Sequence, residues 1–571
     1  MASPTPGVAT GLGIRTCEFS GGSSGEGPLT WAQQFMWEEI RGSDGDAASF
    51  DLFVVVRDPD PIDVDDALSR MAAFVVRHPV LRACLSADLG GPMHQRVVGD
   101  GSFAVRVAEG SPAITGKEIR ALTPLIDDAL PCRGLLVVQD GRVVTVVLRV
   151  SHMSIDRWGH GLLRTDLART MQGQGQSVDE AESRSPLDVT RYEASAAGKS
   201  EEDKSLAHAA QVLRAAPPTL FPVPHRTAES ERYWLGELRS SSIPRALATL
   251  YATRRLMPAG VIIGALAMVA AARAHTDAAL VYVTCGNRIT PDVLSYPGQM
   301  AEEGILVVPV GGHEAGDVMR TASIRSMAAF TRARYEPARR AALLREVEHE
   351  RGMWIDKLGS ALVVNFMADT TATTRGTSPS ATTSPSVFEW TRRTPQEGHL
   401  LFVDVSSTAD EYIIAMRVDT AVLAPAMAET VARSVEWIIT EMVDRPVSVA
   451  DVARHLETVA EDWSRDPGRG SSTNPAGCEE LVRAATSLSD VHVQVETAVD
   501  GRDDLVCYLH DPVGAASPEV LHREVMVRVL ENPGSVAPAR YVVLAEPPGE
   551  AQTPAEWIAA ARVTRAGSGR G

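Results

Sequence analysis

The chain has 571 residues, of which 44% are hydrophobic, and a formal net charge of −18 at pH 7. This length and composition suffice for two or three hydrophobic cores of ordinary domain size. The acidic balance argues against nucleic acid as a partner. The six cysteines lie far apart without a C-x-x-C pair, so we expect buried thiols rather than disulfides or a zinc site. The N-terminus lacks a basic start followed by an apolar segment, which predicts a cytoplasmic location.

The first part of the chain predicts a flexible terminus followed by two helices. Residues 1–27 are rich in Gly, Ser, Thr and Pro, and we expect them to be flexible apart from a short strand near residues 16–19. Thr30 is a suitable N-cap for a helix over residues 30–37. Residues 63–78 have the apolar spacing of a second helix. His78 stands at its end before a proline, which favours a role at the helix end over catalysis.

Residues 143–159 carry the strongest chemical signal. The apolar, β-branched run 143–150 predicts a strand that is buried on at least one face. His152 and Asp156 follow it, four residues apart, just before a helical pattern. A histidine at the end of a buried strand can be fixed in orientation, and its near-neutral pKa suits it to accept or donate a proton. On these residues alone, a structural histidine is the more common interpretation.

The second part of the chain predicts another lobe. Residues 172–230 are polar and punctuated by proline, which is typical of a connection between lobes. Residues 256–272 are strongly apolar but contain a proline and are too short to span a membrane, so we expect a buried core helix. A strand at 279–285 leads into Gly-Asn-Arg, which ends at Arg288. Residues 400–405 and 412–419 predict a hairpin.

The last hundred residues predict a separate small module. Residues 464–477 have the composition of a linker. Beyond them, strands are predicted at 491–495, 505–509 and 541–544, with a helix at 518–530. With a helix before the first strand, these elements would follow an αββαβ-like order, which indicates a small α+β module.

Ser151 to Trp158, Ser-His-Met-Ser-Ile-Asp-Arg-Trp, resembles the H-H-x-x-x-D-G-W signature of the condensation domains of nonribosomal peptide synthetases, which belong to the chloramphenicol-acetyltransferase-like acyltransferases. The histidine that the family uses at its reaction centre falls on His152, and its aspartate falls on Asp156. Ser151 replaces the first histidine and Arg157 replaces the glycine. Weaker motifs follow the family's order at residues 28–37, 77–82, 286–288 and 300–309, so the resemblance covers roughly residues 29–452.

The resemblance implies an α/β (α+β) fold with two chloramphenicol-acetyltransferase-like αβ-sandwich lobes in a V shape, over residues 28–200 and 201–455. A linker, residues 456–477, would precede the module, residues 478–560. The module resembles the C-terminal subdomain of adenylating enzymes. Those enzymes use a lysine near that end, and no lysine follows Lys357 here, which argues against an adenylating role.

The resemblance also implies a reaction and a set of site residues. An amine or a hydroxyl would attack an acyl thioester held on the phosphopantetheine arm of a peptidyl or acyl carrier protein acting in trans. His152 would accept or orient the proton of the nucleophile. Structural support would come from Ser151, Asp156, Trp158 and Arg288, with Arg288 paired to Asp156, and the backbone N–H of Arg157 is the candidate for oxyanion stabilisation.

We expect no bound cofactor and no metal, since His152 has no cluster of further ligands nearby. The expected partners are a carrier protein and a small-molecule amine or alcohol, without nucleic acid or membrane, and the expected state is a monomer. The side chain of Arg157 is expected to point to solvent. Two alternatives remain open: a catalytically inactive module that recruits a carrier protein or a tailoring enzyme, and an acyltransferase that uses coenzyme A. Ser151 and the divergent segment 300–309 favour the former.

Overall fold

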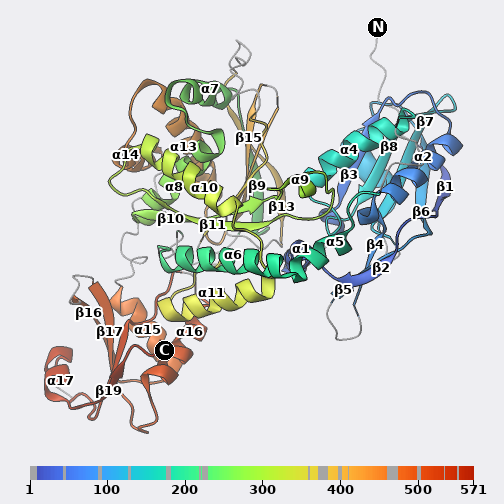
Figure 1. The fold of residues 1–571 in the computed structure, drawn as a ribbon. Helices are drawn as coiled ribbons and strands as arrows, with labels where there is room; N and C mark the ends of the chain where they lie inside the picture. Colours follow the sequence, from blue (N-terminus) through green and yellow to red (C-terminus); the bar gives the residue numbers. More distant parts are fainter. Residues whose placement is uncertain are drawn as a thin grey trace. The chain divides into compact units, whose positions relative to one another are not determined.

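A computed structural model describes the chain in two compact units (Figure 1). Unit 1 comprises Met1–Lys204, Cys285–Glu302 and Arg334–Pro337, and unit 2 comprises Ser205–Thr284, Glu303–Ala333 and Ala338–Gly571. The described residues are all except 1–9, 43–46, 88–92, 127–129, 175–181, 218–219, 221–228, 358–360, 371–383, 396–400, 409, 460–473, 498–502, 533, 550–551 and 571. The segments 285–302 and 334–337 group with unit 1, whereas the sequence placed them in the second lobe.

Unit 1 is built on a five-stranded sheet in the order β1-β6-β7-β8-β3, beside a three-stranded sheet in the order β2-β5-β4. The strands are β1 Thr10–Phe19, β2 Gly25–Pro28, β3 Leu52–Arg57, β4 Ala83–Ala87, β5 Met93–Val97, β6 Gly101–Glu109, β7 Cys132–Gln139 and β8 Arg142–Val150. The helices are α1 Trp31–Gly42, η1 Ala47–Ser49, α2 Val64–Arg77, η2 Pro79–Arg82, α3 Gly116–Leu122, α4 Arg157–Met171, α5 Pro186–Ala194, α9 Pro291–Leu294 and the start of α6 Ala196–Arg214.

Strand β8 is covered on both faces, which explains its continuous apolar sequence. Seven of its nine residues are buried. Leu148 and Val150 lie in one core cluster with residues of α2 and α4 such as Phe74 and Leu163. Val147 packs on the opposite face in a cluster with Ile119 of α3. The chain therefore leaves a rigid, buried strand immediately before His152.

The strand predicted near residues 16–19 is confirmed, but the prediction that the rest of residues 1–27 is flexible is wrong for the part that the structure describes. Strand β1 begins at Thr10 and pairs antiparallel with β6, and β2 pairs with β5. Cys17 and Phe19 are buried in the core of unit 1. The Gly- and Thr-rich composition concealed the strands, because edge strands gain most of their stability from tertiary contacts that composition does not show.

Unit 2 contains a seven-stranded sheet in the order β11-β10-β12-β14-β15-β9-β13. Its strands are β9 Tyr233–Ser240, β10 Ala278–Cys285, β11 Glu302–Pro309, β12 Leu362–Phe366, β13 Val387–Thr394, β14 Leu401–Ser407 and β15 Tyr412–Asp419. The helices of this region, apart from the end of α6, are α7 Ser242–Arg254, α8 Pro258–Ala274, α10 Ala315–Phe330, α11 Pro337–Arg351, α13 Pro425–Asp444 and α14 Val449–Val459. The predicted hairpin is confirmed as β14 and β15, which pair antiparallel.

The apolar segment predicted as a core helix is α8, and 14 of its 17 residues are buried. Among the described residues, no single helix is long and apolar enough to cross a membrane. The bent pair of α7 and α8, with 107° between its helices, meets the length and composition criteria only when the two are taken together.

The C-terminal module follows the predicted αββαβ order and adds one helix and one strand. Its elements are α15 Pro475–Thr486, β16 Val491–Thr497, β17 Asp503–His510, α16 Pro518–Val529, β18 Arg540–Leu544, α17 Pro554–Ala560 and β19 Val563–Gly567. The strands form one sheet in the order β16-β17-β18-β19. The module therefore exceeds the expected 478–560 at both ends. Of the predicted linker 456–477, residues 460–473 lie outside the described residues, and the remaining parts belong largely to α14 and α15.

Candidate functional site

A tight turn after β8 sets the position of His152. The N–H of Ser151 donates to the carbonyl of Pro131 at 2.9 Å, and the N–H of Ser154 donates to the carbonyl of Ser151 at 3.0 Å. The hydroxyl Oγ of Ser151 accepts a hydrogen bond from the N–H of Met153 at 3.3 Å. Local bonds of this kind from a serine stabilise a turn. The side chain of Ser151 therefore supports the loop that carries His152.

The carboxylate of Asp156 is buried and fully engaged. Its Oδ1 accepts the N–H of Gly159 at 2.9 Å, which makes Asp156 the N-cap of α4. Its Oδ2 lies 2.7 Å from Nη1 of Arg288 and accepts the N–H of Met300 at 3.0 Å. Both side chains of the ion pair are less than 5% exposed. A carboxylate with these partners holds the structure together and has little capacity left for proton transfer.

Arg288 joins this pair to the backbone of the segment 285–302. Its guanidinium donates from Nη2 to the carbonyls of Gly298 at 2.7 Å and Tyr296 at 3.2 Å. The same segment approaches α4 closely at Gly159, where an added Cβ would lie 1.8 Å from the carbonyl oxygen of Pro297. Only glycine leaves room for this contact. The Asp156–Arg288 ion pair and the contact at Gly159 together hold the segment 285–302 next to the turn that carries His152.

His152 has an intermediate exposure and lies beside Gln299. The Nε2 atom of Gln299 is 3.4 Å from Nδ1 of the imidazole, and the N–H of Gln299 donates to the carbonyl of Ser154 at 3.0 Å. The Oε1 atom of Gln299 accepts the N–H of Ala301 at 3.1 Å, so the NH₂ end of the amide faces the ring. The neutral amide of Gln299 therefore contacts His152 through Nε2, while the N–H of Ala301 fixes its Oε1 atom.

Burial lowers the pKa of His152 below its usual value of 6.5. The carbonyls of His152 and Ile155 and the charge of Asp156 act in the opposite direction and stabilise the protonated ring, but burial outweighs them. The neutral imidazole therefore predominates at pH 7. A neutral imidazole with polar groups that stabilise its cation is suited to accept a proton.

Arg157 and Trp158 are the first two residues of α4, and both are exposed. The side chain of Arg157 is exposed, as expected from the sequence. Trp158 is 51% exposed and donates from Nε1 to the carbonyl of Leu294 at 3.0 Å. The N–H groups of the first turn of a helix have no acceptors within the helix, and the helix dipole makes this end partially positive. The N–H of Arg157 thus belongs to a region that favours negative charge.

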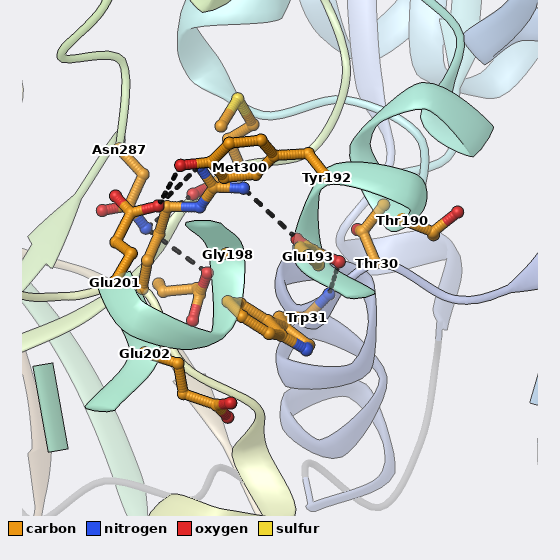
Figure 2. A network of polar contacts seen from close by, with 12 residues as sticks. Thr30, Trp31, Thr190, Tyr192, Glu193, Gly198, Glu201, Glu202, Asn287 and Met300 are labelled. Carbon is orange, nitrogen blue, oxygen red and sulfur yellow. Dashed lines mark hydrogen bonds and ion pairs between the residues drawn. The ribbon is translucent and has the colours of Figure 1, made fainter. Parts of the chain in front are cut away.

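A second polar network of unit 1 gathers around Glu193 (Figure 2). The Oε2 atom of Glu193 accepts the N–H of Trp31 at 3.1 Å, and Oε1 lies 3.6 Å from the guanidinium of Arg334. Arg334 also pairs with Glu201 at 3.4 Å and lies over the ring of Tyr192, 4.9 Å from its centroid. Burial raises the pKa of Glu193 to about 7, although Arg334 and the N–H of Trp31 oppose this shift. The network links α1, α5, α6 and the segment 334–337.

The contacts of His78 are those of a residue that stabilises the fold. It forms the C-cap of α2, and its Nε2 lies 2.7 Å from Oδ2 of Asp166. Its Nδ1 lies 3.2 Å from the hydroxyl of Ser183. Both ring nitrogens are therefore occupied by neighbouring side chains.

No group of three or more His, Cys, Asp or Glu side chains that could hold a metal occurs within the described ranges of the chain. Sequence reasoning missed Gln299 and Gly159. Gln299 immediately precedes Met300, where the resemblance resumes, and that neighbourhood is the only signal in the sequence that could have found it.

No protein-family model and no curated protein matches the sequence. Solved structures do match the fold. The condensation domain that mediates chain release from the enacyloxin polyketide synthase has 11% identity and a TM-score of 0.55, over 78% of this chain and 84% of that chain. The first condensation domain of the calcium-dependent antibiotic synthetase has 16% identity and a TM-score of 0.52, over 75% of this chain and 98% of that chain.

The X-domain from teicoplanin biosynthesis has 15% identity and a TM-score of 0.52, over 74% of this chain and 96% of that chain. The structural match to these three neighbours, together with the several mixed sheets and helices of this chain, confirms the α/β (α+β) fold class expected from the sequence. The chain has the fold of the condensation domains of nonribosomal peptide synthesis.

Proposed function

We propose that the chain is an acyltransferase that joins an acyl or aminoacyl thioester, held on a carrier protein, to an amine or hydroxyl nucleophile in nonribosomal peptide biosynthesis. The observation that carries this proposal is the position of His152. It follows a buried strand of a condensation-domain fold, its neutral form is favoured by burial, and the pair of Asp156 and Arg288 fixes the turn around it.

In the proposed reaction, the nitrogen or oxygen of the nucleophile adds to the thioester carbonyl while the imidazole of His152 accepts its proton. The N–H of Arg157 stabilises the negative charge on the former carbonyl oxygen. Collapse of this tetrahedral intermediate breaks the carbon–sulfur bond, and the departing thiolate receives the proton from the imidazolium. A general base contributes about 10²–10⁴-fold, and the joint positioning of both substrates adds to this.

Intact-mass detection of the product tests the proposal. The full chain is incubated with an acyl-loaded carrier protein and a panel of amines and alcohols, and the wild type is compared with His152→Ala and with Ser151→Ala. We expect His152→Ala to lose at least about a hundredfold in rate. Ser151→Ala removes only one turn hydrogen bond, so we expect it to keep most of the activity. Undiminished product from His152→Ala contradicts the assigned base.

A recruitment module is the second candidate. The X-domain of teicoplanin biosynthesis, which shares this fold, is also known in complex with OxyB, and that complex matches this chain with a TM-score of 0.51. Ser151 in place of the family's first histidine favours this candidate. Absence of product with every donor, together with retained binding of the carrier protein, would support recruitment. Turnover of acyl-coenzyme A without any carrier protein would instead support the coenzyme A alternative.

A further inference from the structure

Unit 1 contains an open groove of about 860 Å³ that lies apart from His152. It runs along β3 and is flanked by α3 and α4. Its cationic side chains are Arg57, Lys117, Arg120 and Arg164. The described residues that line it include no Asp or Glu. A volume of this size is typical of sites that hold a ligand.

The floor of the groove is the unpaired edge of a sheet. Strand β3 ends the sheet order and pairs only with β8 among the described strands. The N–H of Asp58 donates to the carbonyl of Val144 at 2.9 Å, so the even-numbered residues of β3 direct their backbone groups toward β8. The odd-numbered residues face outward, and the carbonyl of Phe53 accordingly contacts Nε2 of His160 at 3.0 Å. The backbone groups of Val55 therefore point into the groove.

The two helices place positive charge on both sides of this edge. Phe53 and Val55 pack with Ile119 on the face that α3 covers. Val54 and Val56 pack with Leu163 of α4 on the opposite face. A strand added beside β3 would thus have α3 on one side and α4 on the other, because its side chains alternate between the two faces.

The cations of the groove are available to a ligand. Arg57, Lys117, Arg120 and Arg164 are all exposed, and none of them pairs with a carboxylate within the described part of unit 1. The two Nη atoms of Arg57 donate to backbone carbonyls, one to Pro112 and the other to Ile114 at 2.9 Å, so this side chain supplies charge more than hydrogen bonds. Arg120 lies over the ring of Phe53 at 4.8 Å from its centroid. These contacts fix the direction of both side chains without neutralising their charge. Four such cations contrast with the net charge of −18 of the chain.

We propose that this groove binds an extended acidic peptide segment of a partner protein. The segment adds to the sheet as a strand beside β3, with backbone hydrogen bonds to Val55. Its Asp or Glu side chains on one face pair with Lys117 and Arg120, and those on the other face pair with Arg164. The proposal concerns an interaction surface and does not depend on the catalytic role of His152.

Charged side chains can also serve only to protect a sheet edge from aggregation. The experiment separates the two roles by direct binding. Fluorescence anisotropy of a fluorescein-labelled peptide of repeating Glu-Glu-Val-Val, which presents Glu on both faces of a strand, is measured against the full-length chain. A Lys-Lys-Val-Val peptide of equal length is the control probe. We expect saturable binding of the acidic peptide that weakens with added salt, and no binding of the basic one.

Two changes test the geometry. The double variant Lys117→Glu/Arg120→Glu should weaken binding at least about tenfold, whereas Arg142→Glu, an exposed charge reversal at the start of β8, should leave it unchanged. N-methylation of alternate backbone amides gives two further peptides. Methylation of the amides whose N–H groups point toward β3 should abolish binding, and methylation of the amides that point away from β3 should leave it intact.

The peptide variants keep the test valid even if a protein variant fails to fold. Absence of binding overturns the proposal and leaves edge protection as the role of the cations. Binding that is insensitive to both methylation patterns also overturns it. Displacement of the peptide by inorganic pyrophosphate together with such insensitivity would indicate a site for small anions instead.

Discussion

Oδ2 of Asp156 and Nη1 of Arg288 lie 2.7 Å apart in a buried ion pair, although 132 residues separate them in the sequence. Asp156 caps the helix that follows His152, and Arg288 binds the carbonyls of its own segment. The pair therefore fixes the turn of His152 against the segment 285–302. Since both charges are buried, removal of one leaves the other without compensation.

The variant Arg288→Ala should lower the free energy of unfolding by about 3–5 kcal/mol, because it leaves the carboxylate of Asp156 buried and unpaired. Chemical denaturation of the full chain measures this loss. Arg15→Ala is the matched control, since Arg15 pairs with Asp65 at the same 2.7 Å but with side chains that are 54% and 80% exposed. That variant should cost at most about 1 kcal/mol. Equal losses in the two variants would contradict the structural role of Arg288.

Two glycines of α4 make a second matched pair. Gly159→Ala should destabilise the chain and lower the proposed acyltransferase activity, because its Cβ would lie 1.8 Å from the carbonyl oxygen of Pro297. Gly161 has no atom within 4 Å of such a Cβ. Gly161→Ala should therefore stabilise the helix by up to about 1 kcal/mol. Thermal unfolding of the two variants measures whether each one loses or gains stability. A gain in stability for Gly159→Ala would refute the close approach of Pro297 to Gly159.

The lowered pKa of His152 predicts a specific pH dependence. Burial disfavours the protonated ring, so the imidazole stays neutral below its usual pKa of 6.5. We expect the decline of kcat/KM toward acid pH to have its midpoint below pH 6.5. The assay uses a hydroxyl acceptor, since an amine acceptor titrates in its own right. A midpoint at or above pH 6.5 would show that burial does not control this histidine.

The sequence predicted the elements that carry strong local patterns. The run 143–150 and the helix α8 are buried and correspondingly apolar, so periodicity and composition identified them. The partnership of Asp156 and Arg288 followed from the order of family motifs. By contrast, only the end of β1, near residues 16–19, was predicted, because the Gly- and Thr-containing first part of this edge strand has a weak local signal.

The residues around His152 were harder to predict for a different reason. The contact of Gln299 with the imidazole and the approach of Pro297 to Gly159 join segments about 140 residues apart. A single amide or glycine carries no periodicity, so only the folded backbone reveals what it touches. The same holds for Glu193, whose position beside Trp31 and Arg334 depends on three separate parts of unit 1.

Glu193 should make the stability of the chain depend on pH near neutrality. Burial raises the pKa of its carboxyl from 4.5 to about 7, so the folded state binds a proton that the unfolded state releases. The resulting stability is fully present below pH 4.5 and is lost as the pH rises through about 7. One pKa unit corresponds to about 1.4 kcal/mol, so a shift from 4.5 to about 7 amounts to at most about 3.5 kcal/mol.

The variant Glu193→Gln isolates this contribution. Glutamine retains an oxygen that can accept the N–H of Trp31, but it does not ionise. Burial also raises the pKa of Glu348 to about 7. Glu348 titrates in both the wild type and the variant, so its contribution cancels in the difference between their free energies of unfolding. The wild type should therefore lose stability relative to Glu193→Gln between pH 5 and pH 8 in urea denaturation. A difference that stays constant with pH would mean that Arg334 keeps Glu193 ionised throughout this range.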